Sequence, residues 1–334
     1  MPRRTSLFFL APAFIGLLAV IVALSPQVQA GPPPAVTVFD ASSVRGSGRE
    51  IALSTTPVGA AALLEGRRGP ARSGVRLLAA APDGQAVVVG PDLVGQPGPL
   101  TIATADGSQI EVALPGVAGA AFEPLGAWLA AVDLTGALWR VEAASGAATR
   151  LADGPFGPQP SVLVGDQILA IHVSSVEAPI WASAVLLAAA GGPEVPIATY
   201  APSGELVYDA VPLADGAVAV VRHRIGGGVA VVRVEPGGSE TLLLSLDAVS
   251  GIAIGPDGKR VAWSDNGRMW LTTTGADAAA LSLGAGAGAR FSPDGSLLLV
   301  YAADRAQVVD LAGKRVADAG PSACWVGDGR GCRP

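Results

Sequence analysis

Residues 289–300 read Ala289-Arg-Phe-Ser-Pro-Asp-Gly-Ser-Leu-Leu-Leu-Val300, an apolar segment, a Pro-Asp-Gly turn and a second apolar segment. Proline presets the backbone for the first central position of a turn and glycine tolerates positive φ, so the pattern predicts a β-hairpin. Two further short segments follow at residues 307–310 and 314–316. We therefore expect a unit of four short strands.

This unit recurs along the chain. Residues 251–263 repeat it around Pro256-Asp-Gly258, residues 77–89 repeat it around Pro82-Asp-Gly84, and weaker copies fill the gaps. The turns of six copies lie at positions 83, 125, 166, 215, 257 and 294, so successive turns are 42, 41, 49, 42 and 37 residues apart. A four-stranded unit that recurs at this spacing is typical of a β-propeller.

The two ends of the chain predict the number of blades. Residues 323–329 match the pattern of residues 289–295, yet only five residues follow them, so they can provide the first strand of a further blade and little more. Residues 35–40 and 49–53 are expected to supply its outer strands, which removes the open edges of the ring. The sequence therefore predicts an all-β, seven-bladed propeller with one blade shared by the two termini. Six blades with frayed ends is the alternative.

The expected propeller domain spans residues 35–334, with 35–56 as outer strands of the closing blade, 77–317 as six full repeats and 322–334 as its inner strand.

Composition limits the class of protein. Half of the 334 residues are hydrophobic and 15% are charged, a balance that excludes a disordered chain. The 44 glycines and 27 prolines follow no Gly-X-Y period, which excludes collagen. The formal net charge is −6, and proteins that bind nucleic acid carry a basic patch instead. We therefore expect no nucleic-acid partner.

Residues 1–30 have the pattern of a secretory signal peptide. A basic start precedes an apolar run at residues 7–24, and small residues lead up to a cleavage site between Ala30 and Gly31. Three prolines make residues 31–34 a stiff spacer. An uncleaved anchor is the alternative, because the apolar run approaches the length that spans a bilayer. The chain is expected to be exported, periplasmic or extracellular, with membrane attachment only through a retained signal.

Cys324 and Cys332 are the only cysteines. In an exported protein two cysteines are most simply one disulfide, and their spacing fits no zinc-binding pattern. Closing a loop this short stabilises the fold by roughly 2–3 kcal/mol in the chain-entropy treatment. We expect the bond to pin the end of the chain locally.

The segments Phe291-Ser-Pro-Asp-Gly295 and Gly255-Pro-Asp-Gly-Lys-Arg-Val-Ala262 resemble the WD40-like (PD40-type) repeats of the TolB propeller group. The resemblance covers most of residues 77–317. It implies a propeller of a kind that is frequently exported and often serves as a protein-binding platform.

Few side chains suggest chemistry. His172 lies in the apolar run 169–173 and is expected to be a strand histidine satisfied by hydrogen bonds. Arg222, His223 and Arg224 precede a run of glycines, so we expect them on a loop, where they are candidates for contact with a partner or an anion. No Gly-x-Ser-x-Gly motif and no spaced metal-binding pair occurs. We assign no catalytic, metal or cofactor-binding residue.

The function expected from these observations is that of an exported, non-catalytic propeller that binds a protein or a cell-envelope component. One alternative is a hydrolase, such as a lactonase-like enzyme, that uses carboxylates in the central channel. It requires acidic or amide side chains at equivalent positions of the blades, whereas the first strands at 77–81, 162–164 and 252–254 are apolar. Another alternative is a sensor or accessory domain.

Overall fold

The structure is a computed structural model that describes residues 42–46, 49–68, 75–91, 98–173, 182–200, 205–224, 227–247, 249–275, 279–320, 323–327 and 329–332. The chain divides into two compact units, residues 1–35 and 36–334, and the described residues all belong to the second. The predicted signal peptide, the cleavage site between Ala30 and Gly31, the spacer 31–34 and the strand at 35–40 lie outside the described residues.

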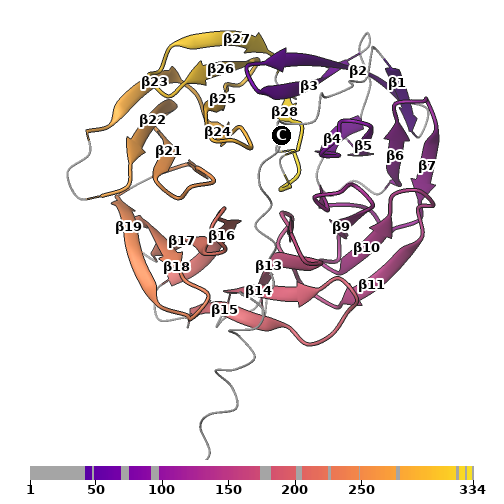
Figure 1. Cartoon of the computed structure of the whole chain (residues 1–334), viewed down its shortest axis with the longest axis horizontal. Helices are drawn as coiled ribbons and strands as arrows, with labels where there is room; N and C mark the ends of the chain where they lie inside the picture. Colours follow the sequence, from indigo (N-terminus) through magenta and orange to yellow (C-terminus); the bar gives the residue numbers. More distant parts are fainter. Residues whose placement is uncertain are drawn as a thin grey trace, which may run out of the picture. The chain divides into compact units, whose positions relative to one another are not determined.

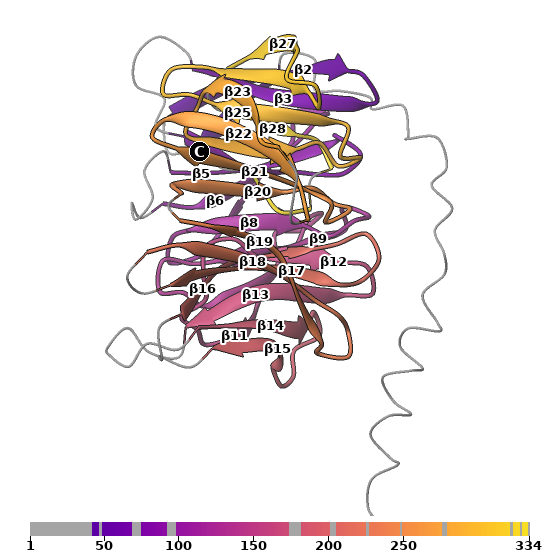
Figure 2. The same ribbon diagram turned by 90° about the vertical axis from the view of Figure 1, so that its left-hand side faces the viewer.

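The described elements are strands β1 to β28, which form seven four-stranded sheets. Figure 1 shows these sheets as blades of a ring, and Figure 2 shows the ring from the side, with its strands running from one face toward the other. The neighbouring strands of each sheet are antiparallel. The fold is the predicted seven-bladed β-propeller, and the six-bladed alternative is wrong.

Six blades are each made from one continuous stretch of chain, between Val75 and Ala319. The first three are β4 (Val75–Ala80), β5 (Ala86–Pro91), β6 (Leu100–Thr104) and β7 (Gln109–Val112); β8 (Gly119–Phe122), β9 (Trp128–Val132), β10 (Leu138–Glu142) and β11 (Ala148–Ala152); and β12 (Ser161–Leu163), β13 (Gln167–Val173), β14 (Ala182–Ala188) and β15 (Val195–Tyr200). The next three are β16 (Glu205–Pro212), β17 (Val218–Arg224), β18 (Val229–Val234) and β19 (Glu240–Leu246); β20 (Gly251–Ile254), β21 (Arg260–Asp265), β22 (Arg268–Thr273) and β23 (Leu281–Ala285); and β24 (Gly288–Phe291), β25 (Leu297–Tyr301), β26 (Ala306–Asp310) and β27 (Arg315–Ala319).

The closing blade joins the two ends of the chain in the order β1-β2-β3-β28. Its strands are β1 (Ser42–Gly46), β2 (Arg49–Val58), β3 (Ala61–Arg68) and β28 (Cys324–Trp325). The sequence predicts two N-terminal strands within residues 35–56, whereas the structure describes three that continue to residue 68. Strand β3 was not predicted, because half of its residues are alanine, glutamate or glycine, which are depleted in strands. The turn at Gly59, with φ of 63°, reverses the chain between β2 and β3.

The core lies between neighbouring blades. Leu64 and Leu53 of the closing blade pack with Leu77 and Val87 of the next blade. On the other side of the closing blade, Trp325 packs with its neighbours in the β24–β27 blade. Because the inner strands are covered on both faces, they are continuous apolar runs, and every residue of β9 is buried. Burial on both faces explains the high apolar fraction and low charge of the sequence.

The predicted turn residues all lie between the first and second strands of their blades. In four of these turns the aspartate Oδ1 accepts a hydrogen bond from the backbone N–H two residues later: 2.9 Å for Asp83, 3.3 Å for Asp215, 2.9 Å for Asp257 and 3.1 Å for Asp294. This side-chain bond stabilises the turn, which explains why aspartate recurs there. We call the face of the ring that carries these turns the turn face.

Candidate functional site

The candidate site is a cavity of about 290 Å³ on the turn face, where the first strands of several blades meet. Its walls contain the prolines of four turns, apolar residues and Pro212 of the first strands, and three polar side chains. The lining residues are Pro82, Pro124, Val162, Val211, Pro212, Ile252, Ala253, Ile254, Pro256, Ala289, Arg290, Phe291, Ser292, Pro293, Gly327, Gly329 and Arg330. The cavity therefore occupies the mouth of the central channel.

One wall of the cavity is made by the described residues that follow β28, namely 326, 327 and 329–332, which we call the C-terminal loop. Figure 1 shows this segment inside the ring. The Val326 N–H donates to Ala62 O over 2.9 Å, the Cys332 N–H donates to Leu78 O over 2.5 Å, and the Val162 N–H donates to Gly329 O over 3.3 Å. The loop is thus bonded to the closing blade, to β4 and to β12.

The loop passes so close to the blades that only glycine fits at position 331. Its φ is 72°, and a Cβ atom there would lie 2.0 Å from the carbonyl oxygen of Ala120. Glycine is the residue that tolerates both conditions. The chain therefore enters the channel by a path that its own sequence specifies.

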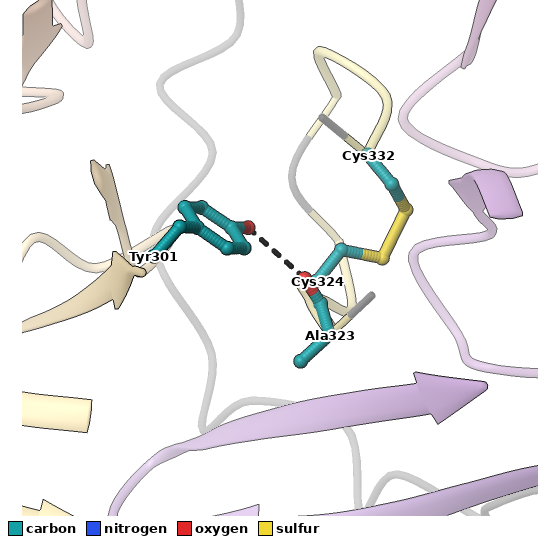
Figure 3. Close-up of a disulfide and its surroundings, with 4 residues drawn as sticks. All are labelled: Tyr301, Ala323, Cys324 and Cys332. Atoms are coloured by element: carbon teal, nitrogen blue, oxygen red, sulfur yellow. Dashed lines mark hydrogen bonds between the residues drawn. A yellow bond between two sulfur atoms is a disulfide. The ribbon is translucent and has the colours of Figure 1, made fainter. Parts of the chain in front are cut away.

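A pair of cysteines closes the loop (Figure 3). The Cα atoms of Cys324 and Cys332 are 5.3 Å apart and their sulfur atoms are at disulfide distance, as the sequence predicted. Beside them the Tyr301 hydroxyl donates to the carbonyl oxygen of Ala323 over 3.0 Å. These contacts hold both ends of the loop against the neighbouring blades.

A buried ion pair links the loop to a fourth blade. Nη2 of Arg330 donates to Oδ2 of Asp209 over 2.9 Å, and the two side chains are 17% and 7% exposed. Oδ1 of Asp209 accepts from the Ala210 N–H over 2.9 Å. The register of β16 shifts between Val207 and Asp209, and a bulge of this kind re-aims side chains. The shift accompanies a change from the exposed Tyr208 to the buried Asp209.

Arg290 brings a second guanidinium group to the cavity. It belongs to β24 and is only 4% exposed. Two residues later, Ser292 donates through Oγ to Oδ1 of Asp294 over 2.6 Å. Burial by itself raises the pKa of Asp294, but hydrogen bonds from Ser292 and Ser296 outweigh it and lower that pKa. Asp294 is therefore charged at neutral pH and stabilises the turn beside the cavity.

The described residues that line the cavity include no acid. Asp209, which lies beside it, is paired with Arg330. The described part of the lining therefore does not show the set of equivalent carboxylates that the hydrolase alternative requires. In the part of the chain that the structure describes, no three His, Cys, Asp or Glu side chains are grouped to hold a metal ion.

Sequence reasoning missed Arg290, Arg330 and Asp209. The available signal was a charged residue within an otherwise apolar first strand, as in Ala289-Arg-Phe291 and Tyr208-Asp-Ala210. Such a strand is buried on both faces, so a charge within it requires a partner or a ligand.

The structure places Arg222, His223 and Arg224 on strand β17, not on a loop as expected. They pair with β16 on one side, and the first two also pair with β18, so the strand continues to Arg224. Nη2 of Arg222 lies 3.3 Å from Oε2 of Glu240. The His223 ring packs against Tyr208, with ring centroids 4.8 Å apart.

These three residues are not part of the cavity. Arg224 pairs with Glu205 at the start of β16, whereas Pro212, which lines the cavity, ends the same strand. At about 3.3 Å per residue the two positions are roughly 20 Å apart along the strand. Their role in contact with a partner stays a prediction.

His172 lies on strand β13 and forms a hydrogen bond through a ring nitrogen, as predicted. Its Nδ1 lies 2.5 Å from Oε2 of Glu194, and its ring packs against Phe156 with centroids 4.8 Å apart. The described residues contain no helix long and apolar enough to cross a membrane.

No protein-family model matches the sequence, and no curated protein does. Solved structures do resemble the fold. Hydrazine synthase of Kuenenia stuttgartiensis is 14% identical over 87% of this chain and 99% of its own, with a TM-score of 0.55. The β-propeller domain of Myceliophteria thermophila Cps50 (Swd1) is 12% identical over 82% and 98%, with a TM-score of 0.52. Oligogalacturonate lyase of Vibrio parahaemolyticus is 10% identical over 81% and 97%, with a TM-score of 0.47. At these identities the likeness concerns the fold alone.

Proposed function

We propose that this chain is an exported, non-catalytic β-propeller of the TolB-like, WD40-like type that binds a protein partner of the cell envelope on its turn face. The Pro-Asp-Gly repeats support the type, and the signal pattern at residues 1–30 supports export. The cysteine pair suits an oxidising compartment. The observation that carries the binding function is the exposure of two large apolar side chains beside the cavity.

Leu125 occupies the turn position at which other blades carry aspartate. The order Glu123-Pro-Leu-Gly126 matches Ala81-Pro-Asp-Gly84, and Leu125 is 85% exposed. In four other turns the backbone N–H at the position of Ala127 donates to the turn aspartate. Here the Ala127 N–H donates instead to Oε2 of Glu123 over 3.1 Å. The turn is therefore complete without any contribution from the leucine side chain. Folding does not account for this residue, whereas a partner that covers it would.

Val164 adds a second exposed apolar side chain in the turn of the next blade. It is 70% exposed and follows β12, whose Val162 lines the cavity. Pro124, the neighbour of Leu125, lines the same cavity. Contiguous exposed apolar surface marks sites of protein interaction, and the turns of these two successive blades each contribute to it beside the cavity.

The charges near this surface indicate the chemistry of the partner. Arg290 and Arg330 are the charged residues among the described lining of the cavity. A partner segment with apolar side chains next to an acidic residue would complement both the exposed turns and the guanidinium groups. We therefore propose a protein segment of this composition as the occupant of the turn face.

Photocrosslinking tests this proposal. A photoreactive residue is placed at position 125, at position 164, or at the control position 316, where Val316 is 49% exposed on the outer strand β27. Each variant of the mature chain is exposed to its own envelope extract. We expect the same protein to be crosslinked from positions 125 and 164, and not from 316. Leu125→Asp, which restores the regular turn residue, should lower the yield at 164 at least fivefold.

Equal crosslinking from all three positions, or none from 125 and 164, would contradict the proposal. N-terminal sequencing of the exported protein tests the compartment separately. A mature protein that begins at Gly31 is expected, and one that retains Met1 would contradict cleavage.

A further inference from the structure

We infer that the cavity at the channel mouth is a carboxylate-binding site that accepts an acid with a compact apolar body. Arg290 and Arg330 are the cationic contacts. The inference goes beyond the proposed function, because a small acid would bind there without any protein partner.

The apolar walls of the cavity favour a ligand with an apolar body. Most of its lining is proline, valine, isoleucine and phenylalanine, including Ile252, Ile254 and Phe291. Its volume of about 290 Å³ is near the lower end of the roughly 300–1,000 Å³ found for ligand pockets. A compact ring or a short branched chain fits such a space better than an extended sugar or nucleotide.

The two guanidinium groups favour a ligand that carries a carboxylate. A guanidinium group carries five N–H donors in a planar fork, which matches the two oxygen atoms of a carboxylate. Arg330 uses Nη2 for Asp209. That contact orients the guanidinium group and leaves further donors of the fork for a ligand. Arg290 is 4% exposed, and an ionic hydrogen bond in such a poorly hydrated environment is stronger than the same bond in water.

The site is assembled from distant parts of the chain. Arg290 belongs to β24, Arg330 belongs to the C-terminal loop, and Asp209, which orients Arg330, belongs to β16. The Trp325 Nε1 donates to the carbonyl oxygen of Arg290 over 3.1 Å and so links the strand of one arginine to β28, from which the loop of the other begins. The two arginines are therefore held in place only when the ring is closed.

The carboxylate could come from a free small acid or from an acidic side chain of a bound protein. Both sources present the same group to the arginines. The experiment therefore includes one arm for each.

Calorimetric titration of the full mature chain, with its disulfide intact, tests the inference. Benzoate is the small-acid probe, and benzyl alcohol is the uncharged control of nearly the same shape. In the second arm, an acetylated and amidated peptide with one glutamate between leucines is compared with its glutamine counterpart. We expect benzoate to bind at least tenfold more tightly than benzyl alcohol. Tighter binding of the glutamate peptide than of the glutamine peptide would show that a protein side chain can also supply the carboxylate.

Arg290→Met removes the guanidinium group and keeps an apolar side chain of similar length, so it should weaken benzoate binding at least tenfold. Arg268→Met is the matched control, because Arg268 is exposed on β22 beside Trp270. It should leave binding unchanged. If Arg290→Met does not fold, the double variant Asp209→Asn/Arg330→Gln replaces it and should show the same loss. Equal binding of benzoate and benzyl alcohol, no binding of benzoate, or full binding by these variants would overturn the inference, whatever the crosslinking at Leu125 shows.

Discussion

The indole Nε1 of Trp325 donates a hydrogen bond to the carbonyl oxygen of Arg290 over 3.1 Å, and the two residues belong to the first strands of neighbouring blades. Trp325 is 1% exposed and packs between the closing blade and the β24–β27 blade. One side chain therefore contributes to the closure of the ring and to the position of the strand that carries Arg290.

Trp325→Ala should destabilise the protein by about 3–5 kcal/mol, because it leaves a large cavity between two blades. Trp325→Phe keeps most of the packing but loses the hydrogen bond, so it should be markedly milder. Urea unfolding of the two variants and the parent measures the difference. A free energy of unfolding for Trp325→Ala within 1 kcal/mol of the parent would show that the closing contact is dispensable, contrary to this prediction.

Breaking the pair between Arg330 and Asp209 should be costly. Arg330→Gln leaves the buried carboxylate of Asp209 without this guanidinium group, a loss that costs about 3–5 kcal/mol in buried pairs. Asp209→Asn should cost less, because the Arg330 side chain is 17% exposed. The double variant removes both charges and should be closer to the parent than either single variant. A double-mutant cycle from urea unfolding provides the measurement. Additive losses in the double variant would argue against the pair.

Asp133 should make stability depend on pH. Burial by itself raises its pKa, but hydrogen bonds from Thr135, Trp139 and Ala137 outweigh burial, so the pKa is lowered. A lowered pKa stabilises the fold above the ordinary pKa of aspartate, and this stabilisation is lost as the pH falls through the lowered value. Asp133→Asn should lose about 1–3 kcal/mol at pH 7 through weaker hydrogen bonds.

The same variant should depend less on pH between about 5 and 2 than the parent, because its side chain does not titrate. Unfolding of both proteins in urea across this range is the test. Asp304→Asn removes a charge from an exposed hairpin and serves as the control. Parallel curves for Asp133→Asn and the parent would contradict a lowered pKa at Asp133.

Removal of residues 31–56 should destabilise the whole ring. The deletion takes away β1 and most of β2, including the fully buried Leu53, and exposes the edge of β3. Each buried apolar side chain lost costs about 1.5–3 kcal/mol, out of a typical total of about 5–15 kcal/mol. Removal of residues 31–34 alone should be nearly neutral. If the longer deletion melts at the temperature of the parent, residues 42–56 are dispensable for closure.

The architecture could be predicted because it depends on repetition. Turn residues such as Asp257 and Asp294 recur at blade spacing, and the same backbone hydrogen bond stabilises both turns. The shared closing blade followed from the unfinished repeat after Ala323. Strand β3 could not be predicted in this way, because the two-residue turn that joins it to β2 lacks the Pro-Asp-Gly motif.

The candidate site could not be predicted from repetition, because it consists of departures from it. Arg290 and Asp209 are charges that interrupt mostly apolar first strands, and Leu125 replaces a regular aspartate. The approach of Arg330 to Asp209 joins residues 121 positions apart, and no local pattern records it. The interpretation of residues 222–224 as a loop was wrong because the strand continues through these charged residues to Arg224.

The register of the closing blade also determines when the fold can be completed. Leu64 of β3 pairs with Cys324 of β28, 260 positions later. During synthesis β3 leaves the ribosome early, and its inner edge has no partner until β28 has also been synthesised. Contacts of such long sequence separation form slowly. A chain that stops before residue 324 lacks the innermost strand of this blade, so the ring cannot be closed until β28 has been made.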